Sequence, residues 1–326
     1  MGYKTTNGLM RHLRDNGIFI SGSTQKKQLR NTGYYHGYKG YRFFGTSSNR
    51  LPFNSYADIN ATILYDSKLK SLLYGKIMYI ETAIKNVALE CILDYTKSES
   101  IQLMLDKAIN SFNNAPVTYT PDQKKKLQQN KLALSAKIHA ALSRAYNEDN
   151  PKITHFYNNI GYSGVPLWAF FEIINMGELG FLLSCLHLDV RKEISLTIGL
   201  GTPIDTDYHL VYKYVYLLKD LRNSVAHNAV VFDARFRKFD PSRSMKQFLK
   251  NEIGLPFVNF KSIGDYFILI CFFLKALGVS KTEIKAFIRE YERITKEYIA
   301  SVDIAVSSIV VRSDLGTRLE TLKRYI

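Results

Sequence analysis

Three side chains in the second half of the chain, Arg222, Asn223 and His227, have types and spacing that fit chemistry on a phosphodiester bond. RNA can be cleaved by internal transfer, in which the ribose 2′-OH attacks the adjacent phosphate. This reaction needs a base, an acid and a cation near the phosphorane. An imidazole can serve either proton role near neutral pH, and a guanidinium can hold two phosphate oxygens. These residues are therefore candidate catalytic residues for RNA cleavage that requires no metal ion.

A helix from about residue 207 to 227 is expected to position this set. Residues of a helix lie at intervals of about 100° around its axis, which predicts a buried arc and an opposite polar stripe. The buried arc contains Leu210, Tyr214, Leu217, Leu218, Leu221 and Val225, and the polar stripe contains Tyr212, Tyr216, Lys219, Asn223 and His227. Asn223 lies one turn before His227, where its amide can orient the imidazole. Arg222 lies between the polar stripe and the buried arc, so its side chain must bend around the helix to reach a phosphate beside His227. One helix therefore supplies only half of a site, which a second copy in a homodimer would complete.

The spacing of Arg222 and His227 also has an ordinary structural explanation. The dipole of a helix favours a partial positive charge near its C-terminus, which suits His227, and Arg222 can be a solvated surface residue. From the spacing alone, both interpretations remain open.

The charge of the chain makes a nucleic acid the expected partner. Forty-four Lys and Arg stand against 29 Asp and Glu, which gives a formal charge of +15, and residues 1–50 contain nine Lys or Arg but only one acid. Such an excess attracts polyanions, although a basic protein can also be merely soluble. Tyrosines between basic residues near the N-terminus can stack on bases or simply pack. The candidate RNA-binding residues are Arg30, Tyr34, Tyr35, Tyr38, Lys39, Arg42, Lys124, Lys125, Lys126, Tyr216, Lys219, Arg235, Arg237 and Lys238.

Three further residues are candidates for a supporting role. Glu81 and Lys85 are spaced as an i, i+4 pair that could steer Arg222 or form a plain ion pair on a helix surface, and Glu172 is a third candidate. The histidines and cysteines show no metal-ligand spacing, so no metal site and no cofactor is expected. The three cysteines lie in apolar stretches, and the longest apolar run has nine residues, which together predict a cytoplasmic protein with no membrane-spanning segment.

Helical periodicity predicts an all-α fold with an irregular basic N-terminal arm and additional C-terminal helices. Apolar residues recur at steps of three and four over 58–95, and Thr120, Pro121 and Gln123 predict the start of a second helix that ends near 147. Further helices are expected over 166–188, 242–252, 262–278 and 281–300. The predicted divisions are an arm over 1–55, a helical domain over 56–240 and a helical extension over 241–326.

The segment from Leu221 to Asn228 resembles the Arg-Asn-x-x-Ala-His signature of the HEPN superfamily. Other blocks resemble the Abi-like (AbiD/AbiF) abortive infection family of bacterial phage-defence proteins, and the resemblance covers roughly residues 8–240. These blocks are Leu29 with Gly33-Tyr34-Tyr35 and Gly37-Tyr38, then Leu64-Tyr65-Asp66 with Leu69 and Ile80-Glu81, and then Pro166-Leu167-Trp168 with Glu172.

The resemblance implies a HEPN-type helical bundle, an RNA substrate, and growth arrest during phage infection. It implies Arg222, Asn223 and His227 as the catalytic set of an endoribonuclease toxin, restrained by a structured non-coding RNA. Many toxins of this superfamily have a tyrosine two residues after the histidine, where this chain has Ala229. The alternatives are a non-catalytic RNA-binding or sensor protein in a phage-defence or toxin-antitoxin system, and a protein-interaction module.

Overall fold

The structure is a computed structural model that describes residues 4–159 and 164–326. Helices make up most of this part of the chain, and the predicted all-α class is confirmed. Within these residues no strand forms, and extended segments meet only in isolated bridges such as Phe19 with Ser55. None of the described helices is both long and apolar enough to cross a membrane.

The chain divides into two compact units. Unit 1 contains the chain up to Met78 together with Asp220–Ser242 and Leu249–Ile326, and unit 2 contains Tyr79–Lys219 and Arg243–Phe248. Each unit is therefore built from segments that are distant in sequence. The division of the sequence at residues 55 and 240 stays a prediction.

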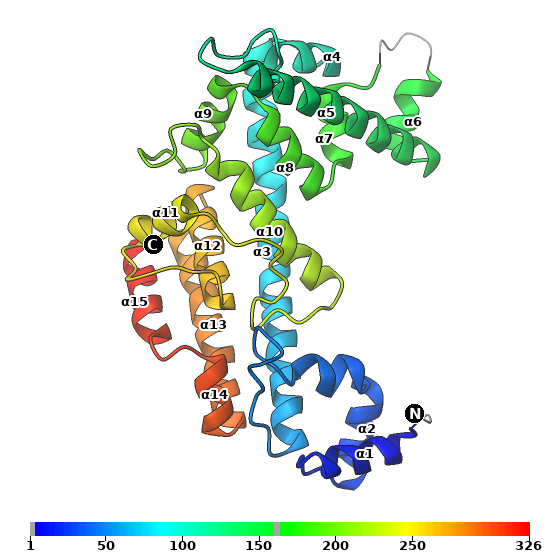
Figure 1. Cartoon of the computed structure of the whole chain (residues 1–326), viewed down its shortest axis with the longest axis vertical. Helices are drawn as coiled ribbons and strands as arrows, with labels where there is room; N and C mark the ends of the chain where they lie inside the picture. Colours follow the sequence, from blue (N-terminus) through cyan, green and yellow to red (C-terminus); the bar gives the residue numbers. More distant parts are fainter. Residues whose placement is uncertain (1–3, 160–163) are drawn as a thin grey trace. The chain divides into compact units, whose positions relative to one another are not determined.

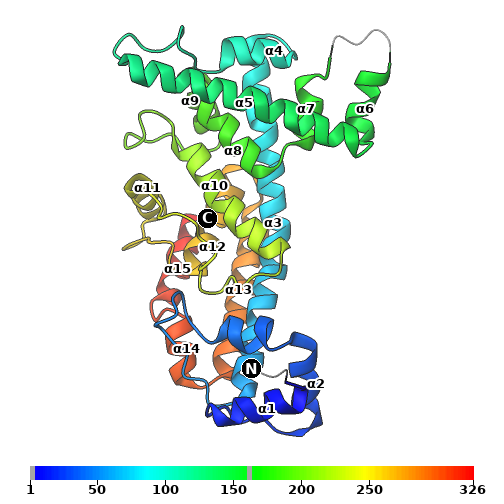
Figure 2. The same ribbon diagram turned by 45° about the vertical axis from the view of Figure 1, so that its right-hand side comes forward.

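Unit 1 combines N-terminal and C-terminal helices (Figure 1). Its elements are α1 (Thr6–Asp15), α2 (Gly22–Thr32), the π-helix η1 (Tyr35–Lys39), the first part of α3 (Tyr56–Thr96), the end of α10 (Leu210–Ala226), the end of α11 (Arg243–Ile253), α12 (Ile263–Ala276), α13 (Lys281–Ser301), α14 (Ile304–Val310) and α15 (Leu315–Tyr325). Helices α1 and α2 pack against each other (Figure 2).

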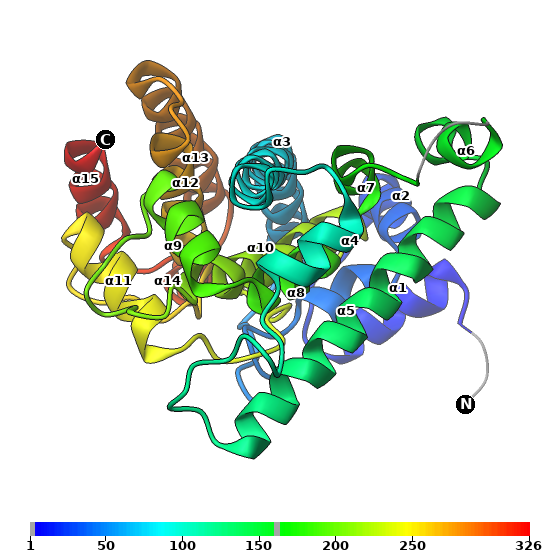
Figure 3. The ribbon, with the colours of Figure 1, turned by 90° about the horizontal axis from the view of Figure 1, so that it is seen from above.

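Unit 2 contains one long basic helix, α5, which packs against α6, α7 and α8 (Figure 3). Its elements are the rest of α3, α4 (Ile101–Leu103), the π-helix η2 (Met104–Ala108), α5 (Pro121–Asn147), α6 (Pro151–Asn158), α7 (Leu167–Ile173), α8 (Met176–Cys185), α9 (Leu188–Thr197), most of α10 and the start of α11.

Helix α3 has 41 residues and confirms the long helix expected from the periodic pattern. The predicted positions Leu69, Leu73, Ile77, Ile80 and Ile84 are all fully buried. Beyond Ile84 the prediction was wrong by one position, because the buried residues are Ala88, Ile92 and Thr96 rather than Val87, Cys91 and Tyr95. A step of four residues advances a helix by about 40° beyond a full turn, so the buried stripe rotates around a long helix.

The core of unit 1 forms around α12, whose residues from Ile263 to Leu274 are all buried. A helix that is apolar on all sides is stable only when neighbours surround it. Helix α13 packs against α12, and the ring of Phe267 stacks on Phe287 and Tyr291 at centroid distances of 4.7 and 4.1 Å. The nine-residue apolar run of the sequence is therefore part of a core helix.

The break between α7 and α8 corrects the prediction of one helix over 166–188. Asn175 accepts hydrogen bonds from the amides of Gly177 and Glu178, and the Glu178 side chain accepts one from the Asn175 amide. This reciprocal capping satisfies amides that would otherwise lack partners at the start of α8, so a new helix begins there. The capping box predicted at Thr120 and Gln123 is confirmed.

The N-terminal segment contains more helix than its composition predicts. Helix α1 includes the expected amphipathic residues Leu9 and Leu13, whereas α2 was not predicted. Gly33, with φ of 73°, ends α2 in a conformation that costs other residues energy. The glycine-rich stretch that follows forms only the short element η1, which is kinked at Gly37, in agreement with the expectation that it forms no long helix.

Candidate functional site

Helix α10 ends at the predicted catalytic segment, with His227 as its C-terminal cap. The amide of Ala229 donates to the carbonyl of Ser224 at 2.8 Å, and the amide of Asn228 donates to Val225 at 3.2 Å. This pair of bonds is a Schellman motif, which requires a left-handed residue after the cap. Asn228 takes that conformation with φ of 52°, which asparagine tolerates better than most residues. The sequence around His227 thus stops the helix at a defined point.

The structure places the three candidate catalytic residues in different environments. His227 is exposed, whereas Arg222 and Asn223 are partly buried. The Arg222 Nη1 donates to Asn223 Oδ1 at 3.1 Å. The amide that was expected to lie against the imidazole therefore orients the guanidinium instead. Because five helical residues correspond to about 140° around the axis, Arg222 and His227 leave α10 in different directions.

The buried face of α10 agrees with the prediction at five of its six positions. Leu210, Tyr214, Leu217, Leu218 and Leu221 are fully buried. Val225 is only half-buried, because it lies in the last turn of the helix. The predicted register is therefore the observed one over most of the helix.

A buried lysine of α3 holds the two residues that follow His227. The Lys70 Nζ donates to Asn228 Oδ1 at 2.6 Å and to the carbonyl of Ala229 at 3.3 Å, and it forms an ion pair with Asp66 at 3.0 Å. An ammonium group has three donors, so these three contacts use all of them. The backbone immediately after His227 is thereby attached to α3.

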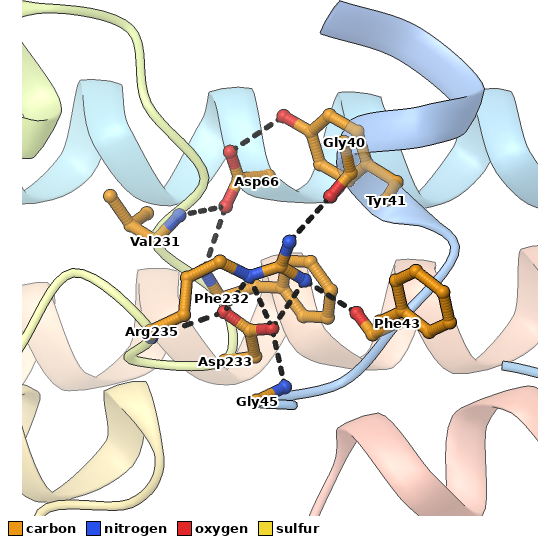
Figure 4. A network of polar contacts seen from close by, with 9 residues as sticks. All are labelled: Gly40, Tyr41, Phe43, Gly45, Asp66, Val231, Phe232, Asp233 and Arg235. Atoms are coloured by element: carbon orange, nitrogen blue, oxygen red, sulfur yellow. Dashed lines mark hydrogen bonds and ion pairs between the residues drawn. The ribbon is translucent and has the colours of Figure 1, made fainter. Parts of the chain in front are cut away.

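Asp66 extends this attachment along the loop of residues 228–235, which we call the post-helix loop (Figure 4). Its Oδ1 accepts hydrogen bonds from the amides of Val231 and Phe232 at 2.8 and 2.7 Å, and its Oδ2 accepts one from the Tyr41 hydroxyl at 2.8 Å. Burial and the Asp66 carboxylate raise the pKa of Tyr41, so its hydroxyl remains a donor. Asp66 is fully buried, and its partners satisfy both of its oxygens.

Arg235 joins the end of the post-helix loop to the N-terminal segment (Figure 4). Its Nη1 donates to the carbonyl of Gly40 at 2.7 Å, its Nη2 donates to the carbonyl of Phe43, and its Nε donates to Asp233 at 2.7 Å. Asp233 is buried and also accepts a hydrogen bond from the amide of Gly45. Arg235 was a candidate RNA-binding residue, but its donors are engaged inside the protein.

We expect Arg235→Ala to lower the free energy of unfolding by about 2 kcal/mol, because Asp233 would stay buried without its cation. Lys238→Ala removes an exposed side chain nearby and should change the free energy of unfolding by less than about 0.5 kcal/mol. Urea denaturation of both variants tests this contrast. Equal stability of the two variants would contradict the structural role of Arg235.

The other N-terminal candidates fall into buried and accessible groups. Tyr38 is only 3% exposed, and its hydroxyl accepts a hydrogen bond from Arg50, so its ring packs inside the protein. Tyr35 is 72% exposed, and the Lys39 Nζ lies 4.4 Å from its ring centroid. Tyr34 and Arg42 are partly buried, and Arg30 is exposed on α2. The accessible group therefore contains both an aromatic ring and cations.

The remaining basic candidates also differ in their environments. Arg237 donates to the carbonyl of Asn259 at 3.2 Å and pairs with Asp240 at 3.3 Å, whereas Lys238 is exposed. In unit 2, Lys125 and Lys126 are exposed and Lys124 is partly buried on the first turn of α5.

Tyr216 and Lys219 are partly buried on α10, with the Lys219 Nζ 5.3 Å from the ring centroid of Tyr216. A Cβ added at Gly180 would lie 3.1 Å from that ring, so the ring packs closely against α8. Burial raises the pKa of Tyr216 to about 12.

The supporting candidates lie in unit 2. Glu81 and Lys85 form the predicted i, i+4 pair at 3.4 Å, and Lys85 also donates to the carbonyl of Ile174 at 2.6 Å. Glu81 is only 4% exposed, so the alternative of a pair on the helix surface is wrong. Glu172 is exposed and pairs with Lys152.

Sequence reasoning missed Asp66, Lys70 and Asp233 as residues that position the site. Asp66 and Lys70 have the same i, i+4 spacing that drew attention to Glu81 and Lys85, so a signal for that pair was present. The contacts to Val231 and Phe232 had no signal, since they join residues 165 and 166 positions apart.

Comparison with known proteins gives one match. A family model described as Abi-like protein matches residues 27–233, which is more than half of the chain. The comparisons with curated proteins and with solved structures give no match. The matched region begins within α2 and ends at Asp233, so it contains α3, α10 and the buried contacts of Asp66 with the post-helix loop. The chain belongs to the Abi-like family, which links it to abortive infection, a form of defence against phage.

Proposed function

We propose that this chain is a metal-independent endoribonuclease toxin of HEPN type that acts in abortive infection. Arg222, Asn223 and His227 form its catalytic set. The enzyme cleaves RNA by attack of the ribose 2′-OH on the adjacent phosphate, and a structured non-coding RNA holds its activity in check.

The observation that carries this proposal is the position of His227. Its imidazole is exposed at the cap of α10, and the next residues are attached to buried Lys70 and Asp66. A group that transfers protons must be accessible to the substrate and held in a defined place. Burial of the imidazole in apolar packing would have been incompatible with the proposal.

Each residue has a role that follows from its chemistry. His227 takes the proton of the 2′-OH or gives one to the departing 5′-oxygen, Arg222 stabilises negative charge on the phosphorane, and Asn223 orients the guanidinium. One copy supplies a single imidazole, whereas the reaction needs a base and an acid. We therefore propose that two copies form a homodimer in which both sets face one scissile bond.

The net charge of the chain and its family support the proposal that an RNA restrains its activity. The chain carries a formal charge of +15, and exposed basic residues such as Arg30, Lys125, Lys126 and Lys238 provide cations for phosphates. The Abi-like family membership supports a defence setting in which a toxin needs such control. Sequencing the nucleic acid that copurifies with the chain would identify the bound RNA.

Analysis of product ends in EDTA tests the chemistry. Purified protein, freed of bound nucleic acid by high salt, is incubated with total RNA and with defined oligonucleotides. We expect cleavage that is insensitive to EDTA and that leaves a 2′,3′-cyclic phosphate and a 5′-hydroxyl, because the 2′-OH is the nucleophile.

Two results would contradict the proposal. Cleavage that EDTA abolishes, or products with a 5′-phosphate, would mean that another nucleophile acts. Tight, salt-sensitive RNA binding without any product would favour the alternative of a non-catalytic RNA-binding or sensor protein. The exposed Tyr35 and the partly buried Lys39 would then be the first residues to examine.

A further inference from the structure

A pocket of about 450 Å³ opens beside the cap of α10, within unit 1. Asn228 and Ala229, the two residues after His227, form part of its wall. Tyr35 and His36 of the N-terminal segment and Asn31 at the end of α2 line another part. The volume lies in the range of pockets that hold small organic ligands.

The charges of this pocket favour a neutral ligand. Lys70 is the lysine that lines it, and its three donors are used by Asp66, Asn228 and the carbonyl of Ala229. A phosphate would need a cation with donors to spare. The pocket is therefore poorly suited to the RNA backbone, although it begins one residue after the proposed catalytic histidine.

The polar and aromatic groups of the pocket suit a planar heterocycle. Tyr35 and His36 are exposed rings of the kind on which unstacked RNA bases stack. Asn31 is exposed and carries both a donor and an acceptor for a base edge. The Asn228 Oδ1 is taken by Lys70, which leaves the amide nitrogen of Asn228 to donate.

Ala229 determines how much room remains. It is exposed and lines the pocket, and its side chain is the smallest among residues 228–230, all three of which line the pocket. A large aromatic side chain at this position would occupy space that a base needs. Because the backbone of Ala229 is already held by Lys70, the wall cannot easily move to make room.

We propose that this pocket is a nucleobase subsite, which receives the base of one nucleotide next to the scissile bond and sets the sequence preference of cleavage. The inference rests on the proposed function, since it assigns the substrate base of the same site. Tyr35 stacks on the base, Asn31 and Asn228 bond its edge, and the phosphate lies outside, towards Arg222 and His227.

The test uses two variants that alter the pocket in opposite ways, with matched controls. Ala229→Phe fills the pocket and Tyr35→Ala removes the stacking ring. Ala305→Phe, on the exposed side of α14, and Phe19→Ala, at a side chain that is 66% exposed, are the controls. Circular dichroism and melting curves establish that all four proteins are folded.

The first arm measures kcat/KM on four RNA oligonucleotides that differ only in the base beside the cleavage site. We expect the native protein to prefer one base, and both pocket variants to lose about tenfold or more on that oligonucleotide with little change on the others. The controls should keep the native preference. Native preference in both folded pocket variants would overturn the proposal.

In the second arm, each of the four nucleoside 3′-monophosphates is titrated into the full-length native protein and into Ala229→Phe. Calorimetry gives the dissociation constant of each nucleotide. Binding that weakens at least tenfold in Ala229→Phe supports the pocket even if no RNA is cleaved, in which case only the proposed function fails. No binding in this arm together with no base preference in the first overturns the pocket, whatever the cleavage activity. Binding of a free nucleotide by a protein that cleaves all four oligonucleotides equally would overturn the role as a substrate subsite.

Discussion

Replacing His227 with alanine is expected to lower kcat for RNA cleavage by about 10²- to 10⁴-fold, because proton transfer by a positioned side chain contributes a factor of this size. The imidazole is exposed at the cap of α10, so its loss leaves no buried cavity. Cleavage of a defined oligonucleotide at saturating concentration in EDTA gives the change in kcat directly. The same variant should no longer arrest growth when it is expressed in bacteria.

A matched control separates catalysis from general effects of losing a histidine. His139 is exposed on α5 in unit 2, so His139→Ala removes an accessible imidazole at another place. It should cleave RNA like the native protein. Activity of His227→Ala within a few fold of native, in a protein of unchanged helical content, would remove His227 from the mechanism.

Arg222 allows a finer test of the same site. Arg222→Ala should also abolish cleavage, and Arg222→Lys should recover only a small part of it. A lysine keeps the charge but lacks the planar fork that holds two phosphate oxygens. Full recovery by lysine would mean that charge alone is needed, and the Asn223 contact that orients the fork would have no role in catalysis.

Replacing Asp66 with asparagine is expected to lower the free energy of unfolding by about 3–5 kcal/mol, since removal of one partner leaves the other charge of a buried pair uncompensated. The carboxylate is fully buried, pairs with Lys70 and accepts hydrogen bonds from Tyr41, Val231 and Phe232. Asparagine has nearly the same shape, so the change reports the loss of charge and acceptors rather than of volume. Urea denaturation measures it.

A surface pair at the C-terminal end of α3 supplies the comparison. Asp94 forms an i, i+3 pair with Lys97, and both side chains are at least 75% exposed. Asp94→Asn should cost less than about 1 kcal/mol, because solvent screens exposed ion pairs. If Asp66→Asn is as stable as Asp94→Asn, the contacts of Asp66 are not what hold the post-helix loop in place.

The double variant Asp66→Asn with Lys70→Met separates two effects: the cost of an uncompensated buried charge, and the loss of the hydrogen bonds that hold the post-helix loop. It removes the uncompensated ammonium and should recover part of the stability lost in Asp66→Asn. Loss of the contacts of Asp66 to the post-helix loop should also lower RNA cleavage in Asp66→Asn. The double variant should not restore cleavage, since the hydrogen bonds of Lys70 to Asn228 and Ala229 are lost as well. Recovery of both properties would mean that the attachment of the loop has no effect on His227.

The sequence by itself determined the all-α class, the long helix α3, the capped start of α5 and the buried face of α10. These features depend on residues three or four positions apart, whose contacts follow from helix geometry alone. It also contained the blocks that resemble the Abi-like family, and the family model confirms that resemblance. Prediction was weaker where a capping signal interrupts a continuous apolar pattern. At Asn175 such a cap divides one expected helix into two.

Only the tertiary structure decided which polar residues are available and which are engaged. Arg235 and Lys238 look alike in sequence, yet Arg235 donates to Gly40 and Phe43, nearly two hundred positions away, and Lys238 stays exposed. Asp66 likewise finds Val231 and Phe232 only because the chain returns to α3 after α10. The type of a side chain states what it can bond, but its partner depends on which distant segment packs beside it, and no local periodicity encodes that choice.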